Sequence, residues 1–193
     1  MNSLLQSVSD AYAEALAARS AAWCQLHPRQ DGTAWSAQEL IEHLVLTMNG
    51  TRQLLETRLE RGRPTRRRAT PIQHLCRVAV LSLRRMSRGV TAPPFTVPGQ
   101  TRRAALRGAE LAELLRHEYE RMDQLLDVCT QRFGKQRVAA HFLLGPLSAE
   151  EWRRFHSIHG RHHLKQLSRI ERANPDPAID SESGSPVQVR RTG

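Results

Sequence analysis

The chain has 193 residues, of which 39% are hydrophobic, a length typical of one domain with a single core. Its three cysteines, Cys24, Cys76 and Cys129, are far apart and form no CxxC pair, which favours reduced thiols in the cytoplasm over a disulfide framework. We expect no secretory leader, because Asp10 interrupts the first apolar stretch. We also expect no membrane span, because no segment approaches about 20 apolar residues.

The net charge is +10 and the pI is about 11.0, values that raise the question of an anionic partner. Arginines are dense at 61–68, and more of them follow between 84 and 103. We interpret this region as a solvated, arginine-rich crossover; the alternative is a patch that binds phosphate groups. Neither a helix-turn-helix nor an aromatic platform accompanies the arginines, so we expect no sequence-specific binding of nucleic acid.

Apolar residues spaced three and four apart predict four long helices, whereas the alternation typical of strands is essentially absent. The first predicted helix covers about residues 3–27 and ends at the proline and glycine of "HPRQDGT". The second begins after Ser36, which forms a capping-box pattern with Glu39, and ends near Glu60.

A long connection follows from about 61 to 101. It contains the apolar stretch "PIQHLCRVAVLSLRRM" at 71–86, which predicts a short extra helix. The proline-rich "GVTAPPFTVPGQT" comes next and predicts irregular structure. The third long helix is predicted over about 102–132.

The segment "FGKQRVAAHFLLGPLS" at 133–148 is predicted to be a loop with one short turn at most. The fourth long helix opens at Ser148, with Glu151 as its capping-box partner, and fades near Ala173. We therefore expect one domain over 1–172. Residues 173–193 are rich in proline, serine and charge and are expected to form a disordered tail.

Four long amphipathic helices with one long connection predict an all-α fold, a four-helix bundle, in which metal and cofactor sites form between facing helices. The fourth helix carries "RFHSIHGRHHLKQL" at 154–167. At 100° per residue, His159 and His163 share the apolar face with Trp152. His162 lies instead on a flank with Lys165, where we expect water.

His159 and His163, at positions i and i+4, have the spacing that brings two imidazoles to one metal ion. A divalent ion needs at least one more protein ligand. His43 of the second helix is a candidate, because it shares an arc with Leu40 and Thr47 that faces the core or its edge. Periodicity alone is equally compatible with three separate core histidines, each hydrogen-bonded to a neighbour.

Other polar residues are candidates for supporting roles. Glu118 falls on the inward stripe of the third helix, where it would hold a ligand histidine, act as a general base or pair with an arginine at the bundle edge. His156 is a candidate neighbour of the site or substitute ligand, and Gln166 a candidate support through hydrogen bonding. His74 and His141 are interpreted as exposed residues outside the site.

Two segments resemble the DinB-like superfamily. "WSAQELIEHL" at 35–44 resembles the entry to that superfamily's second helix, and "HFLLGPLSAEEWRRFHSIHGRHHLKQLSRI" at 141–170 resembles its fourth-helix signature. The resemblance covers roughly residues 1–172. It implies an up-down-down-up four-helix bundle with a divalent ion of nickel, zinc, iron or manganese, held by His43, His159 and His163.

Characterised relatives in that superfamily include transferases and isomerases in which the metal activates a low-molecular-weight thiol. The resemblance therefore implies a metal-dependent transferase or hydrolase that acts on a small-molecule substrate through a metal-activated thiol or water. The alternative is a non-catalytic, stress-associated binding module with a structural or vestigial metal site and a basic crossover that contacts an anionic partner. A cytoplasmic location and a homodimer are compatible with both.

Overall fold

The computed structural model describes residues 1–29, 34–86, 93–99 and 104–175. Its α-helices are α1 (Ser3–Leu16), α2 (Ala21–Cys24), α3 (Ala37–Glu60), α4 (Pro71–Arg77), α5 (Gly108–Phe133) and α6 (Ala149–Ala173). A π-helix η1 (Val78–Ser82), a 3-10 helix η2 (Pro94–Thr96) and strands β1 (Ala139–His141) and β2 (Gly145–Leu147) complete the elements. The predicted all-α class is confirmed, since β1 and β2 form the one small sheet of these residues.

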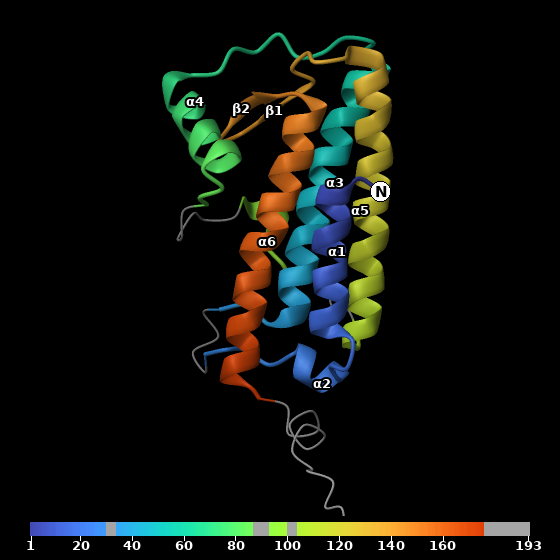
Figure 1. Cartoon of the computed structure of the whole chain (residues 1–193), viewed down its shortest axis with the longest axis vertical. Helices are drawn as coiled ribbons and strands as arrows, with labels where there is room; N and C mark the ends of the chain where they lie inside the picture. The colour runs from blue at the N-terminus through green and yellow to red at the C-terminus, as the bar shows by residue number, and fades with distance from the viewer. Residues whose placement is uncertain (30–33, 87–92, 100–103, 176–193) are drawn as a thin grey trace, which may run out of the picture.

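The long helices α1, α3, α5 and α6 lie side by side along the long axis of the molecule (Figure 1). In that view α1 and α6 run downward, whereas α3 and α5 run upward (Figure 1). The core between them is built from large apolar side chains, among them Leu5, Met48, Leu115, Met122 and Trp152, each at most 1% exposed. This packing brings the buried faces of α3 and α6 into contact.

Two predicted helix starts are confirmed in detail. The Ser36 hydroxyl accepts the Glu39 N–H, and the Glu39 carboxylate accepts the Ser36 N–H in return. Ser148 and Glu151 form the same reciprocal pair at the start of α6. These caps satisfy backbone donors that the first turn of a helix leaves without partners.

The expectation of one continuous helix over 3–27 is wrong. α1 ends at Leu16, and Ser20 caps the separate short helix α2. The first residue of α5, Gly108, donates its N–H to the Arg19 carbonyl and lies so close that a methyl group there would overlap the Leu16 carbonyl. Because α5 begins against this turn, α1 cannot continue through the same space. The third long helix correspondingly starts at Gly108, later than the sequence predicts.

The expectation of a loop without strands at 133–148 is also wrong in part. Ala139 pairs with Leu147 and His141 with Gly145 in an antiparallel hairpin. Gly145 adopts φ +70°, a conformation that favours glycine, as the hairpin enters its second strand. Strands of three residues are too short for period-two alternation to stand out in a sequence.

The crossover folds back over one side of the four helices. The apolar stretch at 71–86 begins as α4 and widens into the π-helix η1, so the predicted single short helix has two parts. α4 packs on β2, η1 packs on α6, and η2 packs on α3 (Figure 1). Among the described residues no helix is long and apolar enough to cross a membrane.

Candidate metal centre

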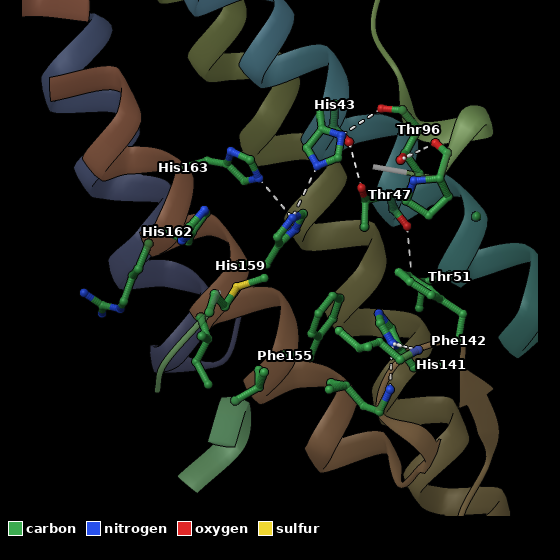
Figure 2. A pocket seen from close by; sticks show the side chains of 18 of the residues that line it. His43, Thr47, Thr51, Thr96, His141, Phe142, Phe155, His159, His162 and His163 are labelled. Carbon is green, nitrogen blue, oxygen red and sulfur yellow. Dashed lines mark hydrogen bonds between the residues drawn. The ribbon is translucent and has the colours of Figure 1, made fainter. Parts of the chain in front are cut away.

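Three histidines from two facing helices converge in the interior. His43 lies on α3, and His159 and His163 lie one turn apart on α6. Their side chains are buried, with 5%, 6% and 6% of their surface exposed. Figure 2 shows the three imidazoles pointing toward one another. The inward direction predicted for His159 and His163 therefore agrees with the structure.

The Nε2 atoms of the three rings form a compact group. His159 Nε2 lies 3.3 Å from His43 Nε2 and 3.0 Å from His163 Nε2. One nitrogen from each ring lies within 4.8 Å of the other two. The ring of Phe155 stacks on His159 at 5.4 Å between centroids, and Trp35 lies 4.8 Å from His43, so aromatic neighbours limit how the rings turn.

Hydrogen bonds at the opposite ring nitrogens decide which tautomer two of these histidines adopt. His43 Nδ1 lies 2.7 Å from the Thr96 carbonyl oxygen, which only accepts, so His43 Nδ1–H donates. His163 Nδ1–H donates in the same way to Gln166 Oε1 at 3.0 Å. The Nε2 atoms of His43 and His163 are then free of hydrogen and present lone pairs to His159.

This donor set fits a divalent cation. Neutral His159 has one ring proton, so its Nε2 can donate to one neighbour at most, and the lone pair of the other neighbour is left without a donor. His159 Nδ1 is buried and has no partner among the described residues. Two Zn–N bonds of about 2.05 Å at a tetrahedral angle separate their nitrogens by about 3.3 Å. The observed separations of 3.3 and 3.0 Å are close to that spacing.

Burial keeps the three imidazoles neutral, which is the form that binds metals. It lowers the pKa of His163 to about 3, and the neighbouring His43 acts in the same direction. Burial also lowers the pKa of His159 far below its usual value, and the neighbouring His163 and His43 lower it further. The pKa of His43 is lowered by burial as well, against the opposing hydrogen bond to Thr96. The cluster is therefore ready to coordinate at neutral pH.

A comparison with protein families gives the wider context for this arrangement. The family model described as the DinB superfamily matches residues 4–167, most of the chain. The chain belongs to the DinB superfamily. Neither the curated proteins nor the solved structures that were compared gave a match. Membership of the DinB superfamily, together with the three-histidine cluster, supports a metal-binding protein.

A cavity of about 1860 Å³ lies beside the three histidines of this DinB-superfamily chain. Its walls come from α3, α6, η1, η2 and the hairpin, so the crossover and the hairpin together enclose space next to the cluster. Trp35, His43, His159 and His163 all line it. A molecule in the cavity would therefore reach the histidines directly, and there is room for much more than a single ion.

The interpretation of His141 as an exposed residue outside the site is wrong. His141 is 9% exposed, lies on β1 and lines the cavity (Figure 2). Its Nδ1 accepts the backbone N–H groups of Leu143 and Leu144 at 3.1 and 3.2 Å, so the ring proton is on Nε2. The sequence gives no clear signal for this position, because strands of three residues are too short to show the alternation typical of a hairpin.

Two of the other candidate residues, Glu118 and His156, lie outside the group of three histidines. Glu118 is buried on α5, and its carboxylate oxygens lie 3.3 Å from Arg52 and 3.4 Å from Arg121. It therefore pairs with arginines, which is one of the roles that the sequence allows. Glu118 is not among the described residues that line the cavity. His156 is buried beside Trp152 and stays outside the group of three nitrogens.

Gln166 supports the cluster through its hydrogen bond to His163, as its position on the helix predicts. His162 is only partly buried, and its Nε2 lies 3.3 Å from Gln166 Nε2. His74 is exposed on α4, as expected. The structure thus brings together the same three histidines that the resemblance implies as ligands, and their role as ligands is a proposal.

Proposed function

We propose that this chain holds one divalent metal ion through His43, His159 and His163 and is a metal-dependent transferase or hydrolase for a small-molecule substrate. The observation that carries the proposal is the convergence of three buried Nε2 atoms, two of them free of hydrogen because their Nδ1–H groups are engaged. Nickel, zinc, iron and manganese all accept imidazole ligands.

Three protein ligands leave at least one coordination position open, which is typical of catalytic rather than structural sites. Such an ion supplies Lewis acidity, which favours the deprotonated form of a thiol or of water at neutral pH. The nucleophile in this proposal is therefore a low-molecular-weight thiol or a water molecule, drawn from the cavity.

The chain itself contributes orientation and a hydrogen-bond donor. Thr96 and Gln166 hold the rings of His43 and His163 with Nε2 toward the centre, as outer partners of metal-ligating histidines do. His141 presents a fixed Nε2–H in the wall of the same cavity. It would donate a hydrogen bond to a substrate oxygen, whereas the apolar ring of Phe155 between it and His159 limits the access of water.

Metal content tests the proposal directly. The purified protein is expected to bind about one divalent ion per chain, and His43→Ala, His159→Ala and His163→Ala should each lower the affinity by at least tenfold, because two ligands hold a divalent ion poorly. His162→Ala is the matched control, since it removes an imidazole from the same helix without touching the converging nitrogens.

Equal losses in all four variants would show that the inward nitrogens are not the ligands. If the three inward variants still bound one ion per chain, the proposed metal site would be wrong. One ion per chain with no turnover of thiol-dependent or hydrolytic test substrates would favour the non-catalytic binding module instead.

A further inference from the structure

Among the described residues that line the cavity, the charged ones are all of one sign. The cationic ones come from the crossover and from α6, and they are Arg67, Arg84, Arg85, Arg161, Lys165 and Arg169. Among the described residues of the lining there is no aspartate and no glutamate. Walls of low polarity with charges of one sign concentrate the electric field inside a cavity and attract ligands of the opposite sign.

The cations on α6 belong to the flank next to the histidine cluster. Lys165 and Arg169 are one turn apart, and both are exposed on the cavity side together with His162. Like charges four residues apart destabilise a helix. η1 packs against α6, and Arg84 and Arg85 follow Leu83, the C-cap of η1, so a second pair of cations faces the same cavity from the crossover.

These cations lack the partners that other arginines of the chain have. Arg116 pairs with Glu113 and Glu120, and Arg154 pairs with Glu150. Within the described part of the chain no ion pair is formed by Arg67, Arg84, Arg85, Lys165 or Arg169. Arg161 differs slightly, because it donates to the Ser7 hydroxyl.

The way in which η1 ends sets the position of Arg84. Arg84 has φ +51°, and it is the one non-glycine residue of the described chain with a positive φ. A left-handed residue directly after the C-cap is a common helix ending, and the N–H of Arg85 accordingly donates to the Ala79 carbonyl at 3.1 Å. Here it places an arginine at the cavity wall, beside the end of a π-helix.

We infer that the cavity takes an anionic small molecule whose carboxylate or phosphate group lies against Arg84, Arg85, Lys165 and Arg169, and whose other end reaches the three histidines. Guanidinium groups suit both anions, because their parallel N–H donors match a pair of anionic oxygens. The inference rests on the proposed function, since it names the substrate class of that site, and it assigns part of the basic crossover to substrate binding.

Succinate and inorganic phosphate serve as probes, and succinamide serves as the neutral analogue. Binding is measured by titration calorimetry on the full chain after removal of metal with a chelator, so that an anion cannot bind to an ion. We expect succinate, phosphate or both to bind with a Kd on the order of 1 mM, and succinamide not to bind. Succinate binding alone assigns a carboxylate substrate, and phosphate binding alone a phosphate ester.

Two double variants and one control variant test where the anion binds. Arg84→Gln with Arg85→Gln, and Lys165→Gln with Arg169→Gln, should each weaken binding of the anion by about tenfold, because each removes charge-assisted hydrogen bonds. Arg61→Gln with Arg63→Gln makes the same change of charge on exposed residues of the crossover that do not line the cavity. That control should change the Kd by less than about twofold.

Metal stoichiometry, measured on the same proteins, separates this inference from the proposed function. His159→Ala should lose metal and keep the anion, whereas the arginine and lysine variants should keep metal and lose the anion. Equal weakening in the control and cavity variants would overturn the inference, because it would mean that net charge alone attracts the anion. Absence of binding by either anion to the parent protein would overturn it as well.

Discussion

At the scale of single residues, the properties of the site depend on which nitrogen of each imidazole has the proton. Carbonyl oxygens decide this for His43 and His163, and backbone N–H groups decide it for His141. The result is two kinds of histidine around one cavity. The inward nitrogens of His43 and His163 offer lone pairs, whereas His141 offers an N–H donor. This division of roles is the basis for both coordination and substrate orientation in the proposed function.

The first prediction at this scale concerns acid stability. Burial lowers the pKa of His141 to about 4, and the two N–H groups that donate to Nδ1 act in the same direction, since they favour the neutral ring. In the unfolded chain the pKa returns to about 6.5. The neutral ring therefore contributes stability that is fully present above about pH 6.5 and is lost as the pH falls toward 4.

The variant His141→Asn removes this titration and keeps an acceptor for the backbone N–H groups. Its free energy of unfolding, measured with urea on metal-free protein, should fall less steeply with decreasing pH than that of the parent. The difference in slope should be about 1.4 kcal/mol per pH unit between pH 6.5 and pH 4. Parallel curves for the two proteins would show that His141 is not buried in neutral form.

At the scale of helices, small and charged residues set how closely the elements approach. Gly160 of α6 lies where a methyl group would overlap the Tyr119 hydroxyl of α5 and the Val8 side chain of α1. The Tyr12 hydroxyl donates to the Gly160 carbonyl at 2.9 Å. This glycine therefore allows α6 to lie close to both neighbours, at the turn that begins directly after His159.

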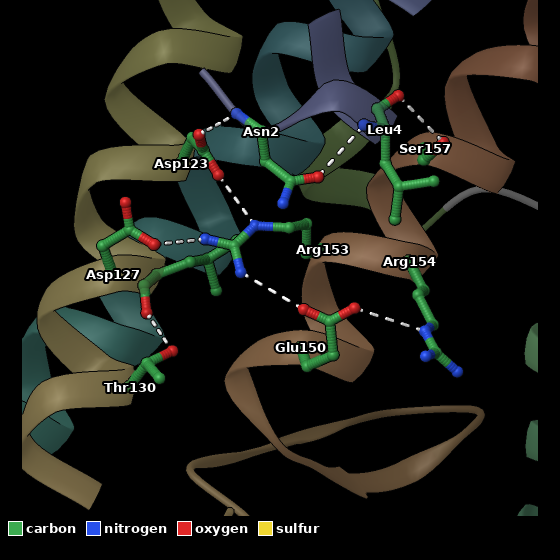
Figure 3. Close-up of polar contacts among 10 residues, drawn as sticks. Asn2, Leu4, Asp123, Asp127, Thr130, Glu150, Arg153, Arg154 and Ser157 are labelled. Carbon is green, nitrogen blue, oxygen red and sulfur yellow. Dashed lines mark hydrogen bonds and ion pairs between the residues drawn. The ribbon is translucent and has the colours of Figure 1, made fainter. Parts of the chain in front are cut away.

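A buried ion pair also connects α5 and α6, and the N-terminal residue Asn2 contacts it (Figure 3). Arg153 of α6 donates from Nε to Asp123 of α5 at 2.7 Å and from Nη2 to Asp127 at 2.6 Å. The other oxygen of Asp123 accepts the N–H of Asn2 at 2.6 Å. Arg153 and Asp123 are both 7% exposed in their side chains, so the buried carboxylate of Asp123 relies on Arg153 for charge compensation.

We predict that Arg153→Met lowers the free energy of unfolding by about 3–5 kcal/mol, because it leaves Asp123 buried without its cation. The matched control is Arg154→Met, the adjacent residue on the same helix, whose exposed side chain pairs with Glu150. The control should cost at most about 1 kcal/mol. Urea unfolding at pH 7 measures both values, and similar losses in the two variants would contradict the assigned role of the buried pair.

At the scale of the whole molecule, the histidine cluster connects parts of the chain that are far apart in sequence. His43 belongs to α3, and the other two histidines belong to α6. An ion held by all three would join these helices and stabilise the folded state by mass action. The carbonyl of Thr96 extends the connection to the crossover through its bond to His43.

Metal should therefore raise the melting temperature of the parent protein by roughly 5–10 °C at 100 times the Kd. His43→Ala should lose this gain and change the metal-free melting temperature little. Deletion of 176–193 should keep the full gain; the disordered tail predicted there lies outside the described residues. The deletion starts after Asn174, because the carbonyl of Asn174 accepts the Trp23 indole N–H at 2.8 Å. A full gain in His43→Ala would exclude His43 as a ligand.

The sequence by itself determined the features that depend on nearby residues. The capping boxes at Ser36 and Ser148 join residues three positions apart, and the i, i+4 spacing of His159 and His163 follows from the pitch of one helix. The fourth-helix signature and the entry to the second helix were also sufficient to indicate the family.

Only the tertiary structure decided the features that depend on distant segments. Leu16 ends α1 because Gly108 packs there, Thr96 reaches His43 from a proline-rich connection, and the hairpin buries His141. The cations of the cavity come from separate elements, so their common environment is invisible along the chain. The physical reason is that helix caps and periodicity act within a few residues, whereas burial, tautomer and electric field arise from the packing of all elements together.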